Sequence, residues 1–247
     1  MSRTDVFGIG FDSLTRAEAV EKAFSLMNER RSAYIVTPNP EIVMASWDDP
    51  ELKAALNSAD LVLPDGIGVV KAAQLMGTPL KAKLPGIDVA TELIARLAAE
   101  KKSVYLFGAK PGVAEKAGAE LTDRFEGLRV CGTHDGYFKD DAPIIADINE
   151  KAPDFLLVCL GSPKQEIWMA KNAPRLNVGI MAGLGGTLDV FAGTVKRAPA
   201  VWQRLGLEWL YRCIKEPWRF KRISKLPRFL FKALGCGIRK IFNGTKG

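Results

Sequence analysis

The sequence predicts an α/β protein with a Rossmann-like, mostly parallel sheet, helices on both faces of that sheet, and a basic helical C-terminal appendage. Apolar runs and segments with helical apolar spacing alternate about six times, and a polar or glycine-rich turn follows each run. The run 154–160 is the most hydrophobic, which is typical of a strand in the middle of a parallel sheet. Ligands bind such sheets beyond the carboxyl ends of the strands, so we expect the functional residues in these turns.

Length and composition are those of a folded globular protein. The chain has 247 residues, of which 47% are hydrophobic and 26% are charged, so it can bury a full core and is not expected to be disordered. Cys131, Cys159, Cys213 and Cys236 show neither C-x-x-C nor metal-ligand spacing, and the N-terminus has no apolar signal region. We therefore expect a reduced, cytoplasmic location. No run of about 18 apolar residues is present, so no membrane span is predicted.

Charge is divided unevenly along the chain. From Lys196 onward lie 14 of the 35 Lys and Arg residues but only two of the 28 acidic residues. This change predicts a Rossmann-like catalytic domain over 1–195 and a basic, aromatic-rich helical appendage over 196–247. A basic tail of this kind is typical of segments that meet phosphates, in nucleic acid or at an anionic membrane surface.

In chain order, the apolar runs predict strands at 6–11, 33–36, 59–63, 103–107, 128–131, 154–160 and 178–181. Helical spacing predicts helices that begin after Ser13 and near Glu41, then over 69–76 and 89–99, after Gly112, and from Lys164 onward. Thr15 and Glu18 have the spacing of a capping box at the first helix. Gly8 and Gly10 match the start of a dinucleotide fingerprint, but Ser13 stands where the third glycine belongs.

Asp65 is the first candidate for a reacting group. It follows the run that ends in Pro64 and precedes Gly66, and these two residues shape the backbone on either side of it. The carboxylate thus stands where an open α/β sheet places its ligands. A carboxylate in this position can also do no more than cap the following helix, and the sequence leaves both interpretations open.

Four other turns carry candidate binding residues. Thr37 and Asn39 follow strand 33–36, where a ligand contact and a helix cap are both possible. Lys83 precedes helix 89–99 and is either an anion contact or a solvated lysine. The glycine turn that begins at Gly108 is of a kind that cradles phosphate on backbone amides. Gln165, after the run 154–160, can both donate and accept hydrogen bonds.

The tail interleaves aromatic and basic residues. Trp202, Trp209 and Trp218 lie among arginines, and apolar residues recur near helical spacing from Phe229 to Phe242. Basic residues beside Trp and Phe are typical of a helix that lies on a membrane surface. Two other interpretations stay open, a solvated basic face packed on the body and a site for single-stranded nucleic acid. The body shows no nucleic-acid recognition module, so no nucleic-acid partner is expected.

Five stretches together resemble the WecG/TagA/CpsF family of bacterial glycosyltransferases, glycosyltransferase family 26. They are Thr37-Pro38-Asn39-Pro40-Glu41, Pro64-Asp65-Gly66-Ile67-Gly68, Gly161-Ser162-Pro163-Lys164-Gln165-Glu166, Gly183-Leu184-Gly185-Gly186-Thr187-Leu188-Asp189, and Glu208-Trp209-Leu210-Tyr211-Arg212 with Glu216-Pro217. The resemblance implies an inverting transfer of a sugar, often N-acetylmannosamine or its uronic acid, from a UDP-sugar to a polyprenyl-diphosphate-linked sugar. It also implies a role in cell-envelope polysaccharide synthesis, with the enzyme peripherally associated with the inner face of the cell membrane.

The resemblance further implies roles for particular residues. Asp65 is expected to be the general base that removes the proton from the acceptor hydroxyl, with Thr37 and Gln165 as further catalytic residues. Donor contacts are expected from Asn39, Lys83, Gly108, Gly161, Ser162, Gly185 and Gly186, and contacts to the lipid diphosphate from Arg212, Arg219 and Arg222. Relatives commonly have arginine where this chain has Lys83, so its role in recognising the donor, and with it the sugar, is open.

No metal and no cofactor besides the UDP-sugar donor is expected, because the chain has no Asp-x-Asp pattern. The pairs Asp48-Asp49 and Asp140-Asp141 fit solvated turns or helix starts. Two alternatives stay open. One is a nicotinamide-dependent oxidoreductase, against which the missing third glycine counts, and the other is a nucleic-acid-binding protein, against which the acidic body counts. The oligomeric state is open, with a homo-oligomer as one possibility.

Overall fold

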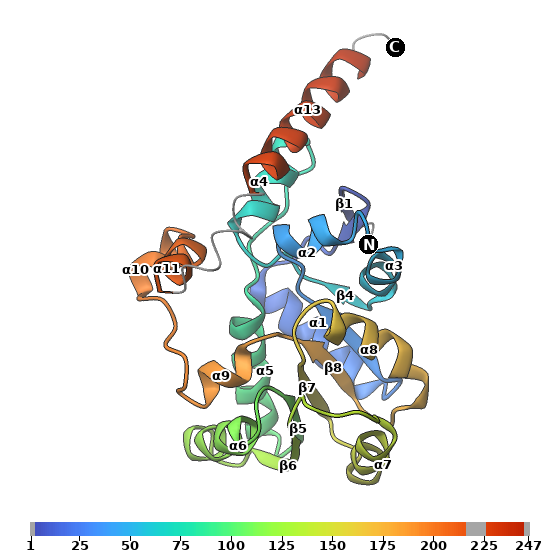
Figure 1. The fold of residues 1–247 in the computed structure, drawn as a ribbon, viewed down its shortest axis with the longest axis vertical. Helices are drawn as coiled ribbons and strands as arrows, with labels where there is room; N and C mark the ends of the chain where they lie inside the picture. The colour runs from blue at the N-terminus through green and yellow to red at the C-terminus, as the bar shows by residue number, and fades with distance from the viewer. Residues whose placement is uncertain (1–2, 216–225, 245–247) are drawn as a thin grey trace.

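A six-stranded sheet forms the centre of the computed structural model, which describes residues 3–215 and 226–244 (Figure 1). The strands lie in the order β4 (Leu61–Val62), β3 (Ala33–Val36), β8 (Ile180–Gly183), β7 (Phe155–Cys159), β5 (Ser103–Gly108) and β6 (Arg129–His134). Every neighbouring pair is parallel. The predicted parallel sheet is confirmed, and all its carboxyl ends meet at one edge.

Helices cover both faces of the sheet, as predicted. On one face lie α1 (Arg16–Asn28), α5 (Gly86–Ala99), α6 (Val113–Arg124) and α9 (Thr187–Phe191). On the other lie α2 (Pro40–Ala45), α3 (Pro50–Ser58), α4 (Ile67–Leu75), α7 (Ala142–Lys151) and α8 (Lys164–Asn172). The last helix, α13 (Leu226–Gly244), packs on α4 and α2 and extends away from the sheet (Figure 1). The short helices α10 (Ala200–Arg204) and α11 (Glu208–Lys215) lie to one side of this body (Figure 1), and a 3-10 turn, η1 (Ala173–Arg175), follows α8. Successive strand residues alternate between the two cores, with Ile35 in one and Tyr34 in the other.

The prediction of one strand over 6–11 is wrong. These residues form a separate antiparallel hairpin, β1 (Thr4–Val6) and β2 (Ile9–Phe11), joined by Phe7 and Gly8. Both turn residues have positive φ, 58° and 83°, which is the backbone of a tight hairpin turn. The apolar alternation fits either arrangement, and a left-handed phenylalanine gives no signal in the sequence, so the turn was not visible there.

The predicted strand at 59–63 is shorter in the structure, where β4 comprises only Leu61–Val62. Its outer edge is completed by Asp12, whose carboxylate accepts from the Val62 amide at 2.9 Å and whose own amide donates to the Val62 carbonyl. Asp12 is buried, and Arg3 and Lys22 neutralise its charge at 3.2 and 2.9 Å. A buried, paired carboxylate therefore closes the sheet beside the turn that carries Asp65.

The predicted apolar helix of the tail is confirmed as α13, which runs along α4 (Figure 1). Phe229 is fully buried, and its ring centroid lies 5.1 Å from that of Phe7 and 6.4 Å from that of Trp47. A Cβ atom at Gly237 would overlap the Leu75 carbonyl, so glycine permits the close approach of the two helices. One side of α13 thus belongs to the core, while the proposed boundary between 195 and 196 stays a prediction.

Replacing Phe229 with Ala is expected to remove about 3–5 kcal/mol of packing and cavity free energy. The matched control is Phe231→Ala on the same helix, because the Phe231 side chain is 73% exposed and its loss should change stability by no more than about 0.5 kcal/mol. Urea unfolding and limited proteolysis of α13 measure the two effects. Equal losses for the two variants would contradict the packing described for α13.

Candidate active site

The carboxyl ends of the central strands open into a cavity of about 530 Å³, a volume in the range of small-molecule sites. We call it the larger cavity, and turns after all six strands line it. These are Thr37 and Asn39 after β3, Asp65 after β4, Ala109 and Lys110 after β5, Gly136 and Tyr137 after β6, Gly161 and Ser162 after β7, and Gly185 and Gly186 after β8. The structure therefore brings together most of the residues that the sequence pointed to. It does so because parallel neighbours deliver their turns to the same edge.

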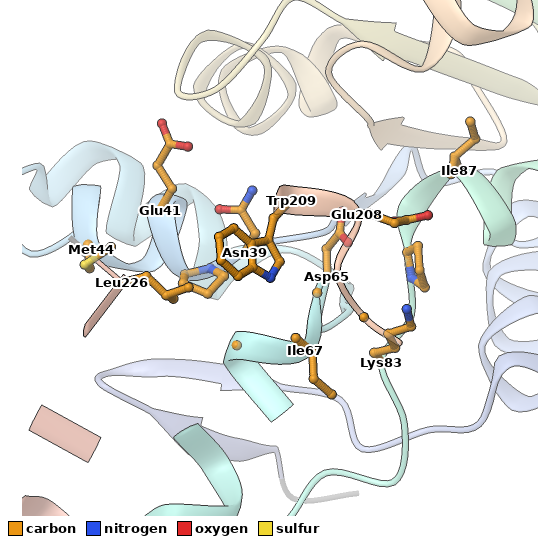
Figure 2. Close-up of a pocket in the computed structure, with 15 residues that line it drawn as sticks. Asn39, Glu41, Met44, Asp65, Ile67, Lys83, Ile87, Glu208, Trp209 and Leu226 are labelled. Atoms are coloured by element: carbon orange, nitrogen blue, oxygen red, sulfur yellow. The ribbon is translucent and has the colours of Figure 1, made fainter. Parts of the chain in front are cut away.

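A smaller cavity of about 220 Å³ adjoins the first. Glu208 and Trp209 of α11 and Leu226 of α13 form part of its wall, together with apolar residues of the body, Met44, Ile67 and Pro85. Figure 2 shows the Trp209 ring beside Asp65 and Glu208 pointing away from it, with Asn39 on one side of Asp65 and Lys83 on the other. The C-terminal segment thus supplies one wall of a site whose remaining walls come from residues before 196.

Asp65 lies where the two cavities meet. Four residues, Asn39, Glu41, Asp65 and Ile87, line both of them. The Asp65 backbone is held by its own amide, which donates to the Pro38 carbonyl at 3.3 Å, and by the Leu84 amide, which donates to the Pro64 carbonyl at 2.8 Å. A carboxylate at this junction can reach groups that are bound in either cavity.

Asp65 lies directly before the N-cap of the following helix, α4. The N-cap of α4 is Gly66, which has a φ of 88° and makes no side-chain cap hydrogen bond. This positive φ favours glycine and turns the chain directly after the carboxylate. Asp65 therefore precedes the cap.

Asn39 is a helix cap as well as a cavity residue. Its side-chain oxygen accepts from the Ile42 amide at 3.0 Å at the start of α2, so the cap interpretation is confirmed for this residue. The same side chain lies on the wall of both cavities. Thr37, by contrast, is buried and lines the larger cavity. The Asn39 amide, held by its hydrogen bond to α2, and the buried Thr37 hydroxyl together form a polar wall that suits a sugar or a phosphate.

Gln165 and Glu166 form a buried pair at the start of α8. The Gln165 side chain donates from Nε2 to Glu166 Oε1 at 2.8 Å and accepts at Oε1 from the Gly185 amide at 2.9 Å. Glu166 is almost fully buried, and its Oε2 has no hydrogen-bond partner. Burial raises the pKa of Glu166 and outweighs the hydrogen bond from Gln165. Glu166 thus orients the Gln165 amide, and sequence reasoning gave it no role because adjacency alone does not show burial.

Lys83 faces the C-terminal segment. Its Nζ donates to the Gln203 carbonyl at 2.8 Å, and the residue lines the smaller cavity. Gly108 is buried at the end of β5, and the two residues after it line the larger cavity. The donor contacts expected from these two residues stay predictions.

The three arginines expected at the lipid diphosphate are placed only in part. Arg212 belongs to α11, the helix that carries Trp209, whereas Arg219 and Arg222 lie outside the described residues, as does Trp218. Lys110, Tyr137 and Asp189 are among the residues of the larger cavity that were not predicted as site residues. Their positions directly after strands, or one turn into a following helix, were the signal that could have identified them.

Within residues 3–215 and 226–244, no group of three or more His, Cys, Asp and Glu side chains is arranged to hold a metal ion. Within the same ranges, no helix combines the length and the apolar content that a membrane crossing needs. Asp49 accepts from the Leu52 amide at 2.9 Å as the N-cap of α3, so the pair Asp48-Asp49 marks a helix start, as predicted.

Known proteins match this chain over most of its length. The model of the glycosyl transferase WecG/TagA/CpsF family matches residues 4–242. A protein of Bacillus spizizenii strain W23 is 38% identical over 208 residues, which cover 84% of this chain and 81% of that protein. A protein of Staphylococcus aureus strain MW2 is 33% identical over 233 residues, 94% of this chain and 92% of that protein. Both are named N-acetylglucosaminyldiphosphoundecaprenol N-acetyl-beta-D-mannosaminyltransferase.

Replacing Glu166 with Gln tests the buried pair, since glutamine keeps an oxygen that can accept from Gln165 and removes the titration. An acid whose pKa is raised on folding binds more protons in the folded than in the unfolded state. The free energy of unfolding of the wild type should therefore fall as pH rises from the ordinary glutamate value of 4.5 through the raised pKa. Urea unfolding between pH 4 and pH 8 should show a flatter profile for Glu166→Gln. Parallel profiles would show that Glu166 is not the group concerned.

Proposed function

The chain belongs to the WecG/TagA/CpsF family of glycosyl transferases, and from this premise we propose that it transfers N-acetylmannosamine from UDP-N-acetylmannosamine to N-acetylglucosaminyl-diphospho-undecaprenol. The family and the activity that the relatives' names describe support this proposal, as does the site at the carboxyl edge of the sheet. The product would be a lipid-linked disaccharide for a cell-envelope polymer. The family assignment leaves the nicotinamide-dependent oxidoreductase and the nucleic-acid-binding protein without support.

The mechanism follows from the position of Asp65 between the two cavities. The UDP-sugar occupies the larger cavity, and the N-acetylglucosamine of the acceptor occupies the smaller one. Asp65 removes the proton from the attacking acceptor hydroxyl, the oxygen of that hydroxyl forms a bond to the anomeric carbon, and the bond to the UDP oxygen breaks on the opposite side. One displacement of this kind inverts the anomeric configuration and releases UDP.

Charge that develops on the departing diphosphate is met by groups of the larger cavity. Gly161 and Ser162 precede Pro163, the N-cap of α8, so they lie at the positive end of that helix's dipole. Lys110 adds a cation on the same wall. Preorganised donors of this kind stabilise a leaving anion, and we therefore propose that transfer proceeds without a divalent cation. The acceptor's own diphosphate is assigned to Arg212, Arg219 and Arg222.

We further propose that the enzyme lies on the inner face of the cytoplasmic membrane through the outer side of α13. On that side Phe231, Leu234 and Ile238 are 73, 42 and 45% exposed. Exposed cations, Arg228, Lys232 and Arg239, lie on the same helix. Exposed apolar residues three and four positions apart, flanked by cations, suit the boundary between acyl chains and anionic headgroups.

Asp65→Asn should lower kcat by about 10²–10⁴-fold, the usual contribution of a general base, because the amide cannot accept the proton. Transfer from a panel of UDP-sugars to a short-chain polyprenyl-diphosphate-N-acetylglucosamine acceptor, with EDTA present, gives the rates. UDP affinity, measured by calorimetry, should stay near the wild-type value. Asp123→Asn, on the exposed side of α6, is the matched control and should leave both quantities unchanged. Turnover retained in Asp65→Asn would overturn the role of Asp65.

Phe231→Glu combined with Leu234→Glu should abolish flotation of the full-length protein with anionic vesicles, because two carboxylates replace apolar contacts and meet like charge. The control is Val195→Glu, an equally polar change at an exposed apolar residue of the body. Circular dichroism checks that α13 stays folded in both variants. Flotation that is unchanged in the double variant would remove the outer side of α13 as the membrane surface.

A further inference from the structure

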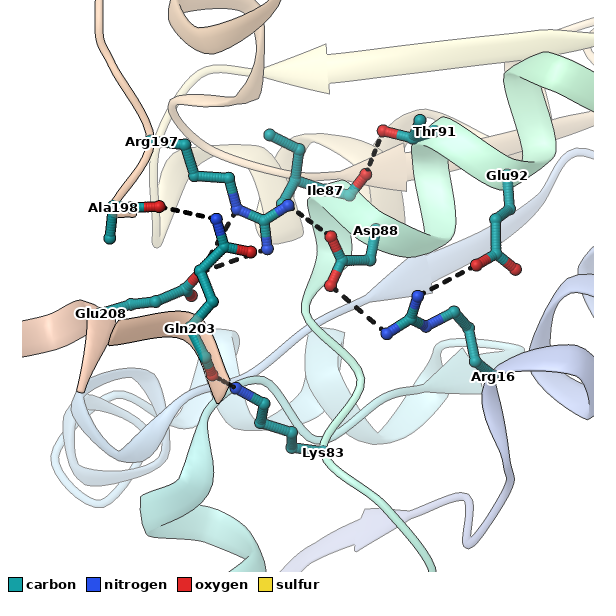
Figure 3. A network of polar contacts seen from close by, with 10 residues as sticks. All are labelled: Arg16, Lys83, Ile87, Asp88, Thr91, Glu92, Arg197, Ala198, Gln203 and Glu208. Carbon is teal, nitrogen blue, oxygen red and sulfur yellow. Dashed lines mark hydrogen bonds and ion pairs between the residues drawn. The ribbon is translucent and has the colours of Figure 1, made fainter. Parts of the chain in front are cut away.

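One guanidinium joins the body to the C-terminal segment. Arg197 donates from Nη1 to Asp88 Oδ1 and, from Nε and Nη2, to Glu208 Oε1 at 3.3 and 3.2 Å (Figure 3). Asp88 lies in the first turn of α5 and Glu208 is the first residue of α11. The three side chains are only 23, 19 and 21% exposed, so water screens their attraction less than it screens a surface pair.

Both carboxylates adjoin the walls of the site. Ile87, directly before Asp88, lines both cavities. Glu208 and the adjacent Trp209 line the smaller cavity. Arg197 therefore connects the two walls that face each other across the acceptor side of Asp65. None of the family stretches in the sequence includes Arg197, and the mechanism above does not use it.

The remaining contacts of this region cannot replace Arg197. Arg16 also reaches Asp88, at 3.7 Å, but its other partner is Glu92, so both of its carboxylates belong to α5 (Figure 3). Lys83 donates to the Gln203 carbonyl, so it holds α10 and not α11. Without the guanidinium, the carboxylates of Asp88 and Glu208 would face each other without a shared cation, an arrangement that favours separation of α11 from α5.

We propose that Arg197 is a positioning residue that holds α11, and with it Trp209, closed over the acceptor side of Asp65. This inference rests on the proposed function, in which the smaller cavity holds the acceptor sugar. Loss of Arg197 should loosen the outer wall of that cavity and leave the larger cavity intact. Binding of the acceptor, and its alignment with Asp65, should suffer, whereas binding of UDP should not.

Cys213 reports on this closure without reference to activity. It lies on α11 and is fully buried, whereas Cys159 is buried at the end of β7 and serves as an internal reference. In full-length Arg197→Ala, alkylation of Cys213 by N-ethylmaleimide, followed by peptide mass spectrometry, should be about 10–100-fold faster than in the wild type, the range that follows from losing charged hydrogen bonds. Arg197→Lys keeps the charge and should give an intermediate rate. Arg16→Ala is the matched control and should leave the rate unchanged.

Kinetics with the same variants complete the test. Arg197→Ala should raise the KM for the lipid-linked acceptor about tenfold or more, with UDP affinity unchanged and partial recovery in Arg197→Lys. An unchanged alkylation rate of Cys213, or faster alkylation with unchanged acceptor kinetics, would overturn the proposal. Were the wild type itself inactive with every donor and acceptor, the proposed function would fail, while the alkylation rates would still decide whether Arg197 holds α11 closed.

Discussion

The parallel alignment of the strands is the constraint on which the rest of the structure depends. Val36 of β3 and Val158 of β7 are both register partners of Gly183 of β8, so three central strands end level with one another. In the sheet, β3 and β8 are neighbours. The chain leaves β3 toward β4 on one side, whereas it enters β8 from β7 on the other side, so a crevice opens between the turns that follow β3 and β8. Thr37, Gly161 and Gly185 are far apart in sequence but share one cavity for this reason.

Much of this arrangement could be predicted because it follows from local pattern. Short apolar runs identified the strands, and the rule that ligands bind at carboxyl ends identified the turns, Asp65 among them. The hairpin at 4–11 could not be predicted, because its turn depends on a left-handed Phe7 that burial of the surrounding side chains enforces. Local sequence patterns do not predict a backbone conformation that tertiary contacts select.

The parts of the site that escaped prediction all depend on contacts between distant segments. The smaller cavity forms because α11 and the start of α13 pack against the body. No single turn in the sequence therefore indicates this cavity. Glu166 was visible as part of a motif, yet its burial follows from the packing of α8 against the sheet. Arg197 was counted among the basic residues of the tail, and only the fold shows that it faces two carboxylates. Charge counting identifies a basic segment, but it does not distinguish a cation that binds phosphate from one that holds the protein together.

The course of α13 has a consequence for where a tethered acceptor can react. The helix begins at Leu226, on the wall of the smaller cavity near Gly68, and runs beside α4 until Gly237 meets Leu75. Because α13 and α4 pack side by side, Asp65 holds one fixed position relative to the outer side of α13. In the proposed function, a membrane that contacts this side would therefore present a lipid-linked sugar to Asp65 in one orientation, without the movement of a loop.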